Sequence, residues 1–144
     1  MKQTARKLNT AIHNFLTLRA SGINWAKQAA PGKWSNKQII GHLIDSAHIN
    51  LQRFVRCTYE DGFKLIYFQE EWVAAQHYNE ADITELLKLW ELVNLQIVRV
   101  LTNYPADREL AECDNGRYES SLNSVAFLAE DYIQHIQHHL NQLN

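Results

Sequence analysis

Residues 82–103 read DITELLKLWELVNLQIVRVLTN and form the clearest helical pattern in the chain. Their apolar side chains recur at spacings of three and four, at Ile83, Leu86, Trp90, Val93, Ile97 and Val100. This period places them along one face of an α-helix, as in helices that pack into a bundle. Asp82, with Glu85 three residues later, is a start signal for such a helix. Pro105 lies just past its end.

Three further segments carry the same period, near residues 4–18, 35–57 and 121–143. Ser35 and Gln38 form a capping-box pattern at the start of the second segment. The chain has only five glycines and two prolines, which is few for the turns of a sheet protein. We therefore predict an all-α protein, an antiparallel four-helix bundle with long connections.

Two of the connections are long enough to have structure of their own. Residues 58–79 contain an extended apolar stretch and a short helical pattern around Glu71-Trp72, so we expect them to pack over one end of the bundle. Residues 106–120 contain the turn signal Asp114-Asn115-Gly116, which predicts a small hairpin. Such connections suit a bundle with at least one crossover. No repeat or linker divides residues 1–144, which we expect to form a single domain.

Charge and hydropathy argue against several classes of partner. The formal net charge is −2 and no lysine–arginine stripe is present, so we expect no nucleic-acid partner. No apolar run approaches the roughly 18 residues of a membrane span, and no signal-type stretch follows Met1. We therefore expect a cytoplasmic protein without a membrane partner. Cys57 and Cys113 are expected to be reduced, structural thiols.

Three of the seven histidines lie between residues 135 and 139. His135 and His139 are four residues apart, so they project the same way from a helix, whereas His138 points elsewhere. The pair falls at the margin of the apolar face of the last helix, where a ligand would be partly covered. Spacing alone leaves two interpretations open, a chelating pair or two solvated histidines.

A catalytic zinc-type site commonly takes three protein ligands and leaves one position open. A third ligand would have to come from another helix, and His42 is the best candidate. Periodicity does not select His42, because it lies away from the main apolar side of its helix at Leu43, Ala47 and Leu51. Taken alone, His42 is interpreted as a surface histidine.

Two sequence elements resemble the DinB-like superfamily, and in particular its YfiT branch of metal-dependent hydrolases. They are Gly41-His42-Leu43-Ile44-Asp45-Ser46, with Arg53 further along the same helix, and His135-Ile136-Gln137-His138-His139. The likeness covers roughly residues 34–143. It implies a four-helix bundle that holds one divalent metal ion on His42, His135 and His139, with zinc or nickel as the first candidates. It also implies a homodimer, because members of this superfamily are often dimers.

The resemblance implies a hydrolase that activates water at the ion and acts on a small-molecule substrate. The same ion could hold a low-molecular-weight thiol, such as bacillithiol, for transfer to an electrophile. A non-catalytic metal-binding bundle is a third interpretation. The metal ligands would be the same in all three cases, so the sequence does not separate them.

Three charged residues near these histidines are candidate catalytic groups. Asp45 and Asp131 are the nearest carboxylates in sequence, and either could orient an imidazole or act as a base. Arg53 shares a face with His42 and could bind an anionic group. The alternative for each aspartate is an ordinary solvated charge, and for Arg53 it is an ion pair with a surface glutamate. Trp72 and Tyr78 are candidates for the walls of the site, or simple packing residues.

Overall fold

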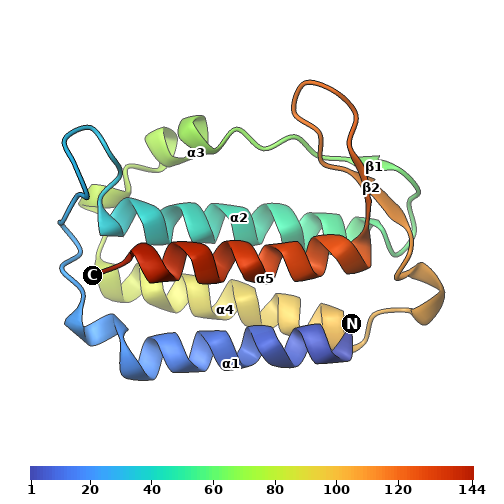
Figure 1. The fold of residues 1–144 in the computed structure, drawn as a ribbon, viewed down its shortest axis with the longest axis horizontal. Coiled ribbons are helices and arrows are strands. Elements are labelled where there is room, and N and C mark those ends of the chain that lie inside the picture. The colour runs from blue at the N-terminus through green and yellow to red at the C-terminus, as the bar shows by residue number, and fades with distance from the viewer.

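The computed structural model describes residues 1–144 and contains four long helices that lie side by side (Figure 1). They are α1 (Lys2–Leu18), α2 (Asn36–Arg56), α4 (Ile83–Thr102) and α5 (Val125–Gln142). The predicted four-helix bundle is thus confirmed. The largest difference is the start of the last helix, which we expected near residue 121. Leu122–Ser124 form a strand instead, and α5 begins after them.

Side-chain caps begin the helices where the sequence predicted them. The Ser35 hydroxyl accepts the backbone N–H of Gln38, and the Gln38 side chain accepts the N–H of Ser35, which completes the capping box of α2. The Asp82 carboxylate accepts two backbone N–H groups at the start of α4. These bonds satisfy donors that have no partner within the helix.

Neighbouring helices do not all run in opposite directions. α2 is antiparallel to α5 and α1 is antiparallel to α4, but α2 and α4 run the same way, as do α1 and α5 (Figure 1). Thr4 bonds to Glu130 near one end of the last pair, and Arg19 bonds to Asn141 near the other. The connection between α2 and α4 therefore returns along the whole bundle, which is the crossover that its length predicted. It runs beside α2 and does not pack over one end of the bundle only, as we expected (Figure 1).

The long connections carry short elements. The first contains β1 (Phe63–Lys64), α3 (Gln69–Gln76) and the 3-10 turn η2 (Tyr78–Glu80), and α3 packs on α2. The second contains η3 (Ala106–Arg108), β2 (Glu112–Asp114) and β3 (Leu122–Ser124), while η1 (Ala20–Gly22) follows α1. β2 pairs antiparallel with β3 and parallel with β1. The predicted hairpin is therefore present, although its loop is longer than a tight turn.

The core lies between the four long helices. Trp90 of α4 is fully buried and meets Phe15 of α1 edge to face, with ring centroids 5.4 Å apart. Leu86, Val93 and Ile97 extend the same buried stripe, as the period of three and four predicted. None of the helices is both long and apolar enough to cross a membrane.

Candidate metal centre

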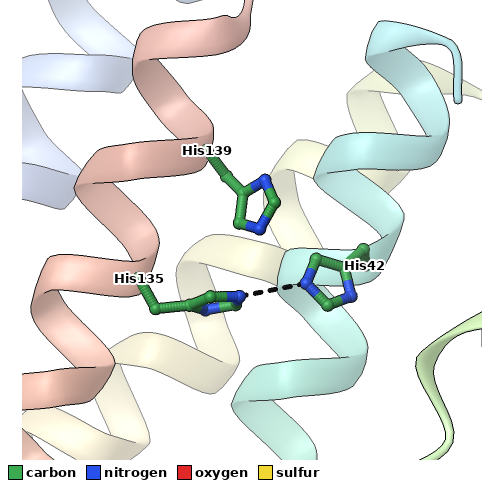
Figure 2. A group of neighbouring side chains, drawn as sticks. All are labelled: His42, His135 and His139. Carbon is green, nitrogen blue, oxygen red and sulfur yellow. Dashed lines mark hydrogen bonds between the residues drawn. The ribbon is translucent and has the colours of Figure 1, made fainter. Parts of the chain in front are cut away.

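Three histidines converge between α2 and α5 (Figure 2). His42 comes from α2, while His135 and His139 come from successive turns of α5. One ring nitrogen of each lies within 4.8 Å of those of the other two. The Nε2 atoms of His42 and His135 are 3.1 Å apart. The predicted convergence is therefore confirmed, and His138 lies outside the cluster, as its position on the helix indicated.

The outward nitrogen of each imidazole already has a partner. In His42, Nδ1 lies 2.9 Å from the hydroxyl of Tyr67. In His135 it lies 3.5 Å from the hydroxyl of Ser46, and in His139 it lies 2.8 Å from the amide oxygen of Gln142. The oxygen of each partner can accept a hydrogen bond, so the tautomer with hydrogen on Nδ1 suits every ring. That tautomer leaves the three Nε2 lone pairs free for a shared ion.

The histidines are held in the neutral form that a metal ligand needs. Burial, followed by the charges of His135 and His139, lowers the pKa of His42 to about 3. Burial and the charge of His139 lower the pKa of His135 to about 4, and burial also lowers the pKa of His139. Protons therefore do not compete for these nitrogens near pH 7.

The spacing of the nitrogens also suits one ion. In a tetrahedral zinc site with Zn–N distances of about 2.0–2.1 Å, two nitrogens lie roughly 3.4 Å apart. The 3.1 Å separation of the His42 and His135 nitrogens is close to this value. Three neutral imidazoles suit zinc, nickel, copper or iron, and three ligands leave a position open. The residues present therefore fit a divalent metal ion.

Tyr67 and Trp34 belong to this centre but were not singled out from the sequence, and Ser46 was noted only as part of the family element. The Tyr67 ring is stacked on His42 at 5.9 Å between centroids, and Trp34 lies 5.2 Å from the same imidazole. Together with α5, they leave His42 only 1% exposed. Ser46 lies one turn after His42, which is the one signal that could have indicated it. Nothing local indicated Tyr67 or Trp34.

Asp45 is fully buried but bonds to none of the three histidines. Its Oδ1 atom accepts a hydrogen bond from the Tyr78 hydroxyl at 2.5 Å and one from Gln76 at 3.4 Å. Its Oδ2 atom is buried without a partner. Burial raises the pKa of Asp45 to about 6. In this structure Asp45 therefore anchors the segment after α3, and the imidazoles are oriented by neutral oxygens.

Arg53 and Asp131 also lie apart from the histidine nitrogens. The buried Arg53 guanidinium donates to the Leu65 carbonyl and to Asn50, and its Nε has no partner. It forms no ion pair with a surface glutamate. Asp131 is exposed and makes no side-chain hydrogen bond. Asp131 therefore orients none of the imidazoles in this structure, and a role for Arg53 in binding an anionic group stays a prediction.

The segment that covers His42 depends on a glycine. Tyr78 crosses α2 at Gly41, where a Cβ atom would lie only 2.1 Å from the Tyr78 ring. This close approach lets the Tyr78 hydroxyl reach Asp45. Trp72 of α3 meets Tyr67 edge to face at 5.8 Å between ring centroids, so it supports the ring that stacks on His42. Trp72 and Tyr78 therefore support the wall of the site rather than line the histidines.

The fold and the histidine cluster define a class, a four-helix bundle with a crossover and a candidate metal site of three histidines. The chain belongs to the DinB superfamily, whose family model matches residues 6–143. The structure is similar to that of YfiT from Bacillus subtilis, with a TM-score of 0.74 and 18% identity over 96% of this chain and 77% of that one. YfiT is described as a probable metal-dependent hydrolase with an unusual four-helix bundle topology. No curated protein matches the sequence.

Proposed function

We propose that the protein is a metal-dependent hydrolase of small molecules. The convergence of His42, His135 and His139, each with its outward nitrogen already bonded, carries this proposal. The description of YfiT as a probable metal-dependent hydrolase supports it. We further propose zinc or nickel as the ion, because three neutral imidazoles suit both.

The three imidazoles would hold the ion without cancelling its charge, because each is neutral. A divalent ion held there would lower the pKa of water toward neutrality and would so supply a nucleophile. Tyr67, Ser46 and Gln142 hold the rings in the binding orientation. Hydrolysis of an ester would break the acyl C–O bond, placing the hydroxyl of water on the acyl carbon and a proton on the leaving oxygen.

Asp45 has a positioning role in this proposal. Its bond to Tyr78 ties the segment after α3 to α2, and the same connection carries Tyr67. Loss of the hydrogen bond between Asp45 and Tyr78 should therefore weaken metal binding indirectly, by displacing Tyr67. The Asp45→Asn variant keeps an oxygen that accepts from Tyr78, so it should bind metal nearly as well as the wild type.

The test begins with protein purified without a nickel column. Elemental analysis identifies the ion, and the protein loaded with that ion is assayed against p-nitrophenyl acetate. We expect about one ion per chain and turnover that is lost in His135→Ala and kept in His138→Ala. A protein that binds the ion but transfers a thiol to monobromobimane, with no ester hydrolysis, would be a transferase instead. A protein that does neither would be a non-catalytic metal-binding bundle.

A further inference from the structure

A cavity of about 700 Å³ opens beside the histidine cluster, at the end of the bundle where α2 begins and α5 ends. His139 and Gln142 form its α5 side, and Ile39 forms its α2 side. The connection between α1 and α2 supplies one wall, including Trp34, and Glu70 of α3 stands on another. In Figure 1 this connection and α3 lie over the same end of α2. The volume suits a small molecule.

Two cationic side chains without a partner line this cavity. Lys27 and Lys33 both line it, and neither ammonium has a hydrogen-bond or ion-pair partner. Elsewhere in the protein Lys7, Lys37, Lys64 and Lys88 bond to a carboxylate or a backbone carbonyl, and Lys2 has no partner. Glu70 is the one acidic side chain in the lining, and it pairs with neither lysine. Two ammonium groups without a partner are therefore available to an anionic group of a ligand.

The other surfaces of the cavity offer a ligand an apolar contact and set the direction in which it binds. Trp34 packs against His42 at 5.2 Å and also lines the cavity, so its indole links the open space to the histidines. A flat or aliphatic part of a ligand could lie along this indole. An acidic group would be attracted to the lysine wall and repelled from Glu70, which selects one direction of binding.

We propose that this cavity binds a small carboxylate-bearing ester, with its acidic group at Lys27 and Lys33 and its chain along Trp34. In this arrangement the bond to be hydrolysed lies beside His139, the one histidine of the cluster that lines the cavity. The inference rests on the proposed hydrolase function and adds the class of substrate. Two exposed lysines attract a carboxylate only modestly, and salt screens this attraction. The effect should therefore appear chiefly as a preference for charged over neutral esters.

The test compares two esters of similar size on the metal-loaded protein. Mono-p-nitrophenyl glutarate carries a carboxylate, whereas p-nitrophenyl valerate does not. We expect kcat/KM for the glutarate ester to exceed that for the valerate ester at low salt. The double variant Lys27→Met/Lys33→Met should reduce this ratio about fivefold, the effect of roughly 1 kcal/mol. Added NaCl should reduce the wild-type ratio in the same direction.

Lys2→Met is the matched control, since Lys2 also lacks a partner but lies outside the cavity. It should keep the wild-type ratio. Ester hydrolysis with no preference for glutarate, or a preference that the double variant keeps, overturns the inference while the hydrolase proposal stands.

Binding measurements separate failure of the substrate class from failure of the hydrolase proposal. If no ester is cleaved, calorimetric titration of metal-free protein with glutarate and with glutaramide tests the cavity directly. Stronger binding of glutarate that the double variant loses supports an anion site, although the hydrolase proposal has then failed. Equal binding of the two probes, or glutarate binding that the double variant retains, overturns the inference.

Discussion

The Nδ1 atom of His42 lies 2.9 Å from the hydroxyl of Tyr67, and the two rings are stacked with an interplanar angle of 9°. Tyr67 belongs to the connection between α2 and α4, and Trp72 meets its ring edge to face. One imidazole of the cluster is therefore oriented by the crossover segment, whereas Ser46 and Gln142 on the bundle helices orient the others.

Removal of the Tyr67 hydroxyl should weaken the metal site without unfolding the protein. Tyr67→Phe keeps the ring stacked on His42 but takes away the partner of its Nδ1 atom. Loss of such a partner typically lowers metal affinity by about 10- to 100-fold. Competition with a chromophoric chelator measures the affinity. Tyr118→Phe is the control, because Tyr118 is 87% exposed and remote from the cluster. Equal affinities of Tyr67→Phe and the wild type would contradict the prediction.

Two neighbouring histidines should differ sharply in their effect on metal binding. His139→Ala leaves only two converging nitrogens, so we expect tight binding to disappear. His138→Ala should retain the ion, because the His138 imidazole lies outside the cluster and bonds to Gln142. Elemental analysis after dialysis checks both variants. The assignment of ligands fails if the His138 variant loses the ion or the His139 variant keeps it.

Gly41→Ala should destabilise the bundle, because its Cβ atom would overlap the Tyr78 ring. Overpacking of this kind costs typically about 1–3 kcal/mol, and the better helix propensity of alanine returns at most about 1 kcal/mol. Urea denaturation measures the change. Gly22→Ala is the matched control, since nothing lies within 4 Å of the added atom. A Gly41 variant as stable as the control would show that Tyr78 moves aside freely.

The free energy of unfolding of the metal-free protein should depend on pH through its histidines. The pKa of His135 is about 4 in the folded protein, whereas the ordinary pKa of a histidine is 6.5. Between these values the unfolded chain binds a proton that the folded protein does not, so this group contributes stability above pH 6.5 that is lost as the pH falls toward 4. The raised pKa of Asp45 acts in the opposite direction below pH 6, because the folded protein then binds the extra proton.

A difference measurement isolates the contribution of His135. Between pH 7.5 and pH 5.0 the metal-free wild type should lose more free energy of unfolding than His135→Gln, by on the order of 1 kcal/mol. Urea denaturation of both proteins at both pH values gives the comparison, and the effect of Asp45 is common to the two. Parallel losses in the two proteins would show that His135 titrates normally when folded.

The homodimer stays a prediction. α4 exposes Leu89 and Leu92, three residues apart, at 43% and 49% of their surface. Apolar side chains paired in this way suit a contact between chains. Light scattering should give about twice the 16.8 kDa mass of one chain. A mass that stays at the monomer value at high concentration would rule the dimer out.

Local patterns were enough to predict the helices and part of the site. The period of three and four in residues 82–103 and the caps at Ser35 and Asp82 depend on neighbours within a few residues, and the structure confirms them. The spacing of four between His135 and His139 belongs to the same class, because helical geometry alone aligns their side chains. The start of α5 was misplaced because pairing of Leu122–Ser124 with β2 is a contact that no local pattern reports.

His42 shows where local information ends. Its place away from the main apolar side of α2 favoured a surface histidine, and only the family resemblance indicated a ligand. In the structure it is 1% exposed, because Tyr67 and Trp34 from two separate connections close over it. The sequence by itself therefore determined the helices, their caps and the alignment of His135 and His139 on one side of α5. The third ligand, its orienting tyrosine and the cavity depend on how the crossover packs on the bundle, since burial comes from contacts between residues far apart in the chain.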